Sequence, residues 1–260
     1  MTMLLWARAT REQLREAAPR AVAVLPVGAV EQHGPHLPTG TDAAVAEAVA
    51  RAACERTGAG VVTLLAPTLA FGSSDHHLPF GGTLSLSPAT LSAVLADLLR
   101  SLRAGGCERA LIVNAHGGNA EICGAAAKSA AVACDMLVGA VSYWNVSEAP
   151  GELGGLPFPG HAGAFETSLM LALAEGEVER GALAPSPGWA GCGAGEVRGA
   201  LASAPEPPVG AVVDDPREWE RIGGWTDDPR AATAASGTRA IERAGRGVAA
   251  VIDALARRER

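Results

Sequence analysis

Aromatic residues are scarce in this sequence. Phenylalanine, tyrosine and tryptophan make up 4% of the 260 residues, so the core must be built from alanine, valine and leucine. The five cysteines stand at irregular spacing without a CxxC pair, which argues against a disulfide framework and favours a reducing, cytoplasmic environment.

The sequence also lacks a basic block, a membrane-spanning run and a signal peptide. Its formal net charge is -7, so we expect no nucleic-acid partner. No apolar run reaches the roughly 18 residues of a membrane span. Arg8, Arg11 and Glu12 interrupt the N-terminal region, so we expect neither a membrane span nor a signal peptide. A P-loop is excluded, because no Gly-Lys-Ser or Gly-Lys-Thr motif is present.

Short apolar runs alternate with helical patterns along the chain. The runs predict strands at 21–29, 60–72, 109–119 (running into a glycine-rich loop) and 136–144. The helical patterns, with their caps, cover 9–17, 42–58, 87–106, 120–134, 165–175 and 230–258. This alternation predicts an α/β fold of three layers, α/β/α, with a mostly parallel sheet. Residues 182–229 are rich in glycine, proline and alanine and predict an ordered loop layer on one domain spanning 1–260.

Each of the six histidines follows a predicted strand or lies in a loop that opens a helix. Ligands collect at the carboxyl ends of strands in an open α/β sheet. We therefore expect four loops from distant parts of the sequence to meet there, namely those at 31–36, 73–83, 114–119 and 159–168.

Glu31, His33 and Asp42 form the first candidate site. Residues two apart in an extended segment point the same way, so Glu31 and His33 can reach one point in space. Asp42 opens a predicted helix, where the helix dipole favours a carboxylate. Carboxylate oxygens and imidazole nitrogens are ligands of Zn²⁺, Mn²⁺ and Fe²⁺. The alternative is a set of helix caps and ion pairs around a hydrogen-bonded histidine.

His116 forms a second candidate, two residues beyond a branched apolar run. Gly117 and Gly118 allow the backbone to approach a ligand closely. The alternative is a glycine-rich turn with a satisfied histidine, and the presence of the first cluster favours a ligand. If these imidazoles bind metal, their other ring nitrogens need partners, and the candidates are Gln32, Asn114 and Asn119.

The loop before the helix at 165–175 supplies His161 and Glu166. Glu166 is a metal ligand, a base or a simple helix-start carboxylate. His76 and His77 are weaker candidates, which we assign to substrate contact or to the surroundings of the metal ligands.

Four motifs in this order resemble the creatininase (creatinine amidohydrolase) family: LPVGAVEQHGPHLP, NAHGGN, VSYW and GHAGAFETSLMLAL. The resemblance implies a three-layer α/β fold and two divalent metal ions, often zinc or manganese. It also implies hydrolysis of a C–N amide bond in a small molecule, commonly a cyclic amide, and a homo-oligomer that is often a hexamer.

Carried over by motif, the resemblance implies that Glu31, His33, Asp42 and His116 bind metal, with Asp42 bridging both ions. It implies that His161 transfers a proton and that Trp144 lies at the substrate pocket.

The sequence departs from creatininase at two motifs. Creatininase has Tyr and a metal-binding Glu after the histidine of the third motif, whereas this chain has Gly117 and Gly118. Glu166 is the candidate replacement, as ligand or base. Creatininase also has Trp and Glu shortly before its catalytic histidine, where this chain has Pro157 and Gly160, so the contacts expected for creatinine are absent.

We therefore expect an amidohydrolase that acts on a cyclic amide, a formamide or a similar small amide. The alternatives are a peptidase-like maturase of the mycofactocin type and a metal-binding scaffold that has lost its hydrolytic site.

Overall fold

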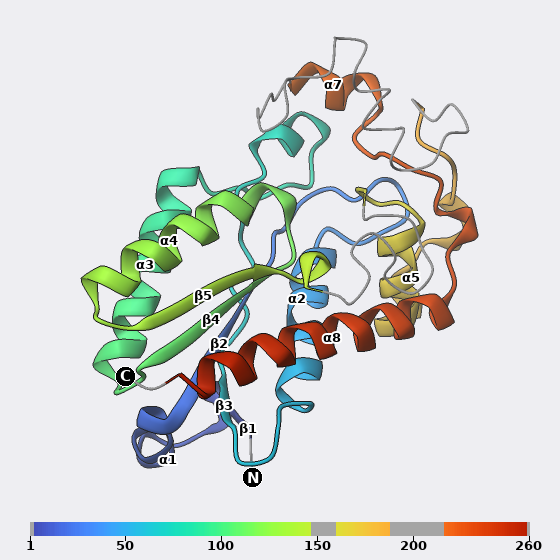
Figure 1. The fold of residues 1–260 in the computed structure, drawn as a ribbon. Coiled ribbons are helices and arrows are strands. Elements are labelled where there is room, and N and C mark those ends of the chain that lie inside the picture. The colour runs from blue at the N-terminus through green and yellow to red at the C-terminus, as the bar shows by residue number, and fades with distance from the viewer. Residues whose placement is uncertain (1–2, 147–159, 188–215, 259–260) are drawn as a thin grey trace.

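A computed structural model describes residues 3–146, 160–187 and 216–258 (Figure 1). Five parallel strands form one sheet in the order β1-β3-β2-β4-β5. The strands are Met3–Leu5 (β1), Ala21–Val27 (β2), Val62–Leu65 (β3), Arg109–Asn114 (β4) and Leu137–Ser142 (β5). The predicted α/β fold with a parallel sheet is confirmed.

The central strand β2 is buried on both faces, because helices cover the sheet on both sides (Figure 1). Val22 and Val24 pack into one core with Thr41–Cys54 (α2), Ala164–Leu173 (α5) and Ala234–Ala256 (α8). Ala21, Ala23 and Leu25 point the other way, because side chains alternate along a strand. They pack with Arg11–Ala17 (α1), Pro88–Ala104 (α3) and Ala120–Ala133 (α4). The predicted three layers are therefore present.

Two helix starts follow the expected capping chemistry. The Thr10 side chain accepts a hydrogen bond from the Gln13 amide within a capping box at the start of α1. Ser87 Oγ accepts a hydrogen bond from the Thr90 amide, and Pro88 is the first residue of α3. These side chains satisfy backbone N–H groups that have no partner inside the helix.

One expected strand is shorter in the structure, and one short strand was not expected. The strand expected at 60–72 ends at Leu65, because Pro67 cannot donate to the sheet and restricts the residue before it. The edge strand β1 was not predicted, since three residues are too few for a recognisable pattern. The expected loop layer at 182–229 contains the short helix Pro216–Arg221 (α7). Residues 188–215 of that layer lie outside the described residues.

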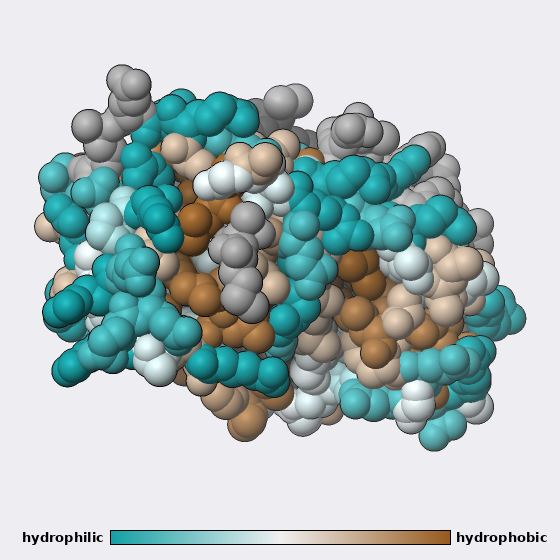
Figure 2. Space-filling model, turned by 90° about the horizontal axis from the view of Figure 1, so that it is seen from below, coloured by the Kyte–Doolittle hydropathy of each residue, from teal (hydrophilic) through white to brown (hydrophobic). Residues whose placement is uncertain are grey.

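Figure 2 shows the molecule from below, the end at which the chain termini lie in Figure 1. Hydrophilic residues surround two areas of apolar residues on this face. Among the described residues, no helix combines the length and the hydropathy needed to cross a bilayer.

Helices α5 and α8 approach each other closely at Gly237. A Cβ atom at this position would overlap the carbonyl oxygen of Ser168 and would lie 2.9 Å from the amide nitrogen of Leu169. Both atoms belong to the backbone of α5 and cannot rotate away. This contact fixes the helix that carries Glu166.

We expect Gly237→Ala to lower the free energy of unfolding by about 1 kcal/mol. Overpacking costs about 1–3 kcal/mol and outweighs the gain in helix propensity of about 1 kcal/mol. Gly124→Ala in α4 is the matched control, because a Cβ there meets nothing within 4 Å, and it should raise stability. Urea unfolding of both variants measures the difference, and equal stabilisation would contradict the close helix contact.

Candidate metal centre

The loops that carry the candidate ligands leave the carboxyl ends of neighbouring strands. β2 leads to Glu31 and His33, and β4 leads to His116. These two strands are adjacent although β3 lies between them in the sequence, and such a switch point is where open α/β sheets bind ligands. Asp42 in the first turn of α2 and Glu166 in the first turn of α5 complete the group.

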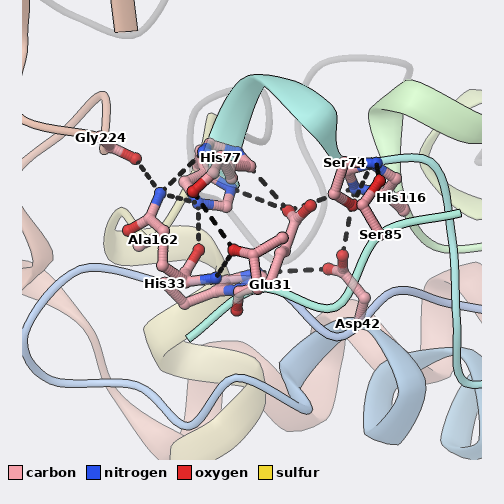
Figure 3. A network of polar contacts seen from close by, with 12 residues as sticks. Glu31, His33, Asp42, Ser74, His77, Ser85, His116, Ala162 and Gly224 are labelled. Carbon is pink, nitrogen blue, oxygen red and sulfur yellow. Dashed lines mark hydrogen bonds and ion pairs between the residues drawn. The ribbon is translucent and has the colours of Figure 1, made fainter. Parts of the chain in front are cut away.

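Asp42 lies between two imidazoles. Its Oδ1 atom is 3.3 Å from His33 Nε2, and its Oδ2 atom is 3.2 Å from His116 Nδ1. Glu31 Oε1 is 3.2 Å from the same His116 nitrogen, and Glu166 Oε2 is 3.7 Å from His33 Nε2. The ligand atoms thus form two groups that share Asp42, as Figure 3 shows for the residues it labels.

These groups fit metal ions better than they fit hydrogen bonds. Glu31 Oε1 and Oε2, His33 Nε2 and Asp42 Oδ2 are buried without a hydrogen-bond partner. Charge-assisted N–H···O bonds are about 2.7–2.9 Å long, shorter than the spacings here. Two ligand atoms of one tetrahedral zinc ion, each about 2.0–2.1 Å from it, are separated by about 3.3 Å. Buried clusters of this kind are consistent with a two-metal site, and Glu31, His33 and Asp42 offer atoms within 4.8 Å of one another.

Backbone carbonyls orient both imidazoles. His33 Nδ1 lies 3.1 Å from the carbonyl oxygen of Glu31, and His116 Nε2 lies 3.0 Å from that of Ser73. A carbonyl can only accept, so each of these ring nitrogens donates its N–H. The opposite nitrogen of each neutral ring is therefore bare and faces the carboxylates, as a metal ligand requires.

The expected partners Asn114 and Asn119 act on the backbone rather than on the rings. Asn114 Nδ2 donates to the carbonyl of His116 at 2.7 Å. Asn119 Oδ1 accepts from the amide of Ser73 at 2.9 Å, and Ser73 in turn holds the His116 ring. Of the three expected partners, Gln32 is the one that contacts imidazole nitrogens.

The site has a strong excess of negative charge. Three carboxylates are buried, and no lysine or arginine is among the buried residues of the described ranges. Burial by itself would lower the pKa of His33, but the carboxylates of Asp42, Glu166 and Glu31 raise it to about 10. The pKa of His116 is likewise raised, by Glu31 and Asp42, against the effect of burial. The positions of these two rings are therefore those where a cation is most favoured.

Glu166 has the least favourable surroundings of the three carboxylates. Burial, together with the charges of Asp42 and Glu31, raises its pKa to about 7. Its Oε2 accepts a hydrogen bond from the amide of Ala162. Ala162 has a positive φ of 52°, a conformation that costs about 1–3 kcal/mol and clusters at functional sites.

His161 and His77 stack beside the carboxylate of Glu31, with ring centroids 4.2 Å apart. His161 Nδ1 is 3.5 Å and His77 Nε2 is 3.7 Å from Glu31 Oε1. Burial lowers the pKa of His77 to about 2 and lowers that of His161 well below its usual value. Both rings are therefore neutral. His76 lies outside them, with its ring centroid 5.9 Å from that of His116.

An aromatic side chain that the sequence did not reveal covers these rings. Trp219 of α7 lies 4.7 Å from His77, 5.3 Å from His76 and 5.7 Å from His161 between ring centroids. The expected pocket residue Trp144 packs edge-on against Tyr143 at 5.1 Å, and its contact with substrate stays a prediction. The sequence gives no signal for this position beyond the presence of tryptophan in its segment.

The surroundings of Gly118 explain why this chain has no glutamate at the position where the creatininase motif has one. A Cβ atom there would collide with the carbonyl of Ser73 and would lie 2.6 Å from His116 Nε2. No carboxylate side chain fits at this position without moving the His116 ring. Besides Asp42, the carboxylate that faces His33 in this chain is that of Glu166. Pro157, at the second departure, lies outside the described residues.

Comparisons with known proteins agree with this geometry. The family model described as creatinine amidohydrolase, or creatininase, matches residues 7–252. The chain is 37% identical over 171 residues to the mycofactocin precursor peptide peptidase of Mycolicibacterium smegmatis, which covers 65% of this chain and 64% of that protein. The chain thus spans less than two thirds of the length of that relative.

Two solved structures extend the match over nearly the whole chain. A mutant creatininase complexed with creatine is 26% identical, covers 98% of this chain and 99% of its own, and has a TM-score of 0.77. A structure described as creatininase Mn is 28% identical, covers 96% of this chain and 97% of its own, and has a TM-score of 0.77. The similarity therefore includes a small-molecule complex and a manganese form.

We expect the affinity for divalent ions to rise with pH. An ion must displace a proton from His33, whose pKa is about 10, and from His116, so protons compete throughout the range below pH 10. Each displaced proton changes the apparent affinity by about tenfold per pH unit. Zinc binding measured against a competing chelator between pH 6 and 9 tests this, and an affinity independent of pH would contradict the ligand assignment.

Proposed function

The chain belongs to the creatininase family, and from that premise we propose that it is a hydrolase that uses two divalent metal ions to cleave a C–N amide bond. The observation that carries the proposal is the position of Asp42. Its two carboxylate oxygens face different imidazoles, at 3.3 Å and 3.2 Å. This is the arrangement that a carboxylate needs to bridge two ions.

The ligands would divide between two ions: Glu31, Asp42 and His116 would hold one, and His33, Asp42 and Glu166 would hold the other. Mixed nitrogen and oxygen ligands suit Zn²⁺ and Mn²⁺, and also Fe²⁺. Two divalent cations would compensate the three buried carboxylates, which no buried lysine or arginine of the described ranges does.

When bound, two such ions polarise a carbonyl and make water acidic enough to attack it at neutral pH. The protein must then move protons. His161 Nδ1 faces the site across 3.5 Å from Glu31, and its other nitrogen contacts the carbonyl oxygen of Gln32 at 2.7 Å. His161 can take a proton at Nδ1 and deliver it to the departing nitrogen, which leaves poorly as an anion.

The substrate bond is the finer part of the proposal. A small cyclic amide or formamide agrees with the buried ligands and with the covering ring of Trp219. The similarity to a precursor peptide peptidase favours a peptide amide as the second candidate. His76, Trp144 and Trp219 are proposed substrate contacts. The homo-oligomer, hexameric in the resemblance, stays a prediction.

The number of ions bound per chain distinguishes the roles of the proposed ligands. We expect two ions per chain in the unaltered protein, loss of both in Asp42→Asn because the bridge is gone, and loss of one in Glu166→Gln. Glu47→Gln is the matched control on the same helix, because Glu47 pairs with Arg51 at the surface. Elemental analysis after gel filtration gives the counts. Two ions in Glu166→Gln with turnover lost would make Glu166 a base rather than a ligand.

Hydrolysis tests the function itself. We expect protein loaded with Zn²⁺ or Mn²⁺ to hydrolyse the C–N bond of at least one of four classes: cyclic ureides and lactams (by ring opening), formamides, small linear amides, and short peptides. Asp42→Asn should lower this rate by more than about 100-fold, beyond the loss of an outer partner of a metal ligand. Two bound ions without hydrolysis of any class would support the inactive scaffold instead.

A further inference from the structure

Gln32 lies between two proposed metal ligands in the sequence, yet its side chain points to other groups. The backbone amide of Gly34 donates to Gln32 Oε1 at 2.9 Å. Gln32 Nε2 donates to the carbonyl oxygen of Gly224 at 2.5 Å, a contact visible beside the labelled Gly224 in Figure 3. Exchange of the amide oxygen and nitrogen would place two acceptors together and two donors together, so the orientation of the amide is fixed.

This orientation determines the tautomer of His77. The second N–H of Gln32 Nε2 points to His77 Nδ1 at 2.8 Å. An amide nitrogen can only donate, so His77 Nδ1 must be a bare acceptor. The ring proton of neutral His77 is then on Nε2. That atom is buried without a hydrogen-bond partner and lies 3.7 Å from Glu31 Oε1.

The backbone of Gln32 determines the tautomer of His161, which is also protonated at Nε2. His161 Nε2 lies 2.7 Å from the carbonyl oxygen of Gln32. A carbonyl can only accept, so Nε2 carries the proton and Nδ1 is bare. The 3.1 Å contact between His161 Nε2 and Gln32 Nε2 is then a close approach and not a hydrogen bond, because both amide hydrogens already have acceptors.

We propose that Gln32 is a positioning residue that holds the stacked imidazoles of His77 and His161 in the same Nε2-protonated tautomer but with opposite nitrogens toward Glu31, so that His77 presents an N–H and His161 presents a lone pair beside that carboxylate. His77 is therefore not a metal ligand, although Glu31, His77 and His161 are close enough to hold an ion. Its N–H lies 3.7 Å from Glu31 Oε1, beyond hydrogen-bond distance, and its partial positive charge favours the ionised carboxylate.

The role in catalysis rests on the proposed function. If His161 accepts a proton from water, its bare Nδ1 must face the site at the start of the reaction. A neighbouring donor on His77 keeps the two rings from competing for one proton. Figure 3 shows His77 and His116 on either side of the Glu31 carboxylate, so donor and proposed ligand meet the same group from different directions.

The tautomers can be measured without a substrate. The zinc-loaded full chain is labelled with ¹⁵N at its six histidines, and the ring nitrogens are assigned through single substitutions. We expect His77 protonated at Nε2 and His161 protonated at Nε2. In Gln32→Met, which keeps the length but removes the amide, His77 should lose its fixed tautomer. His161 should keep its own, because the backbone carbonyl remains.

Thr83→Val is the matched control. Thr83 Oγ1 accepts a hydrogen bond from the backbone amide of Gln32 and donates one to the backbone carbonyl of His77. This variant therefore removes hydrogen bonds to the same two residues and leaves the side-chain amide of Gln32 in place. Both tautomers should be unchanged. Circular dichroism verifies that each variant folds.

Ion content and turnover complete the test. His77→Ala should retain two zinc ions, whereas His116→Ala should lose ions. Gln32→Met should lower kcat by about 10–100-fold at saturating zinc. A bare Nε2 on His77 in the unaltered protein, or loss of an ion in His77→Ala, would overturn the inference. Failure of every substrate class with the expected tautomers would refute the proposed function and leave the tautomer assignment intact.

Discussion

The structure depends on the compensation of three buried carboxylates. Removing a carboxylate from water costs several kcal/mol even after the protein relaxes. Glu31, Asp42 and Glu166 are buried together, and no buried lysine or arginine accompanies them in the described ranges. The neutral imidazoles of His77 and His161 supply no positive charge, and those of His33 and His116 supply it only while they are protonated. Divalent cations would supply it, and their binding would then contribute to the stability of the fold as well as to chemistry.

The parallel sheet brings these charged residues together without placing any of them in its apolar core. β2 is buried along its whole length and contributes only apolar residues, so the ligands lie beyond its end rather than within it. The neighbouring strand β4 delivers His116 at the same edge. Helix starts add Asp42 and Glu166, and the partial positive charge of a helix N-terminus favours both. Small residues such as Gly237 allow α8 to hold α5 in place.

The predictable parts of this protein are those with a local signal. Thr10 and Ser87 mark helix starts through their own hydrogen bonds, and histidines after apolar runs mark the ligand loops. β3 was overestimated because an apolar run alone does not show where Pro67 ends it. Glu31 and His33 were expected to reach one point, and the structure agrees, since together with Asp42 they offer ligand atoms within 4.8 Å of one another. Contacts between distant segments had no such signal, and Gln32 and Gly224 are separated by 192 residues.

Helix α7 and the segment that follows it show how metal ligands and substrate contacts can vary independently within one family. Thr226 exchanges backbone and side-chain hydrogen bonds with His161, Gly224 holds the amide of Gln32, and Trp219 covers the imidazoles. Trp219, Gly224 and Thr226 lie outside the four motifs that carry the family resemblance. A family member can therefore keep the same metal-ligating residues while changes in this segment alter the positions and the tautomers of the neighbouring imidazoles. Function resides in such sites rather than in the fold, so a peptidase and a cyclic amidohydrolase can share the same carboxylates and differ in what surrounds them.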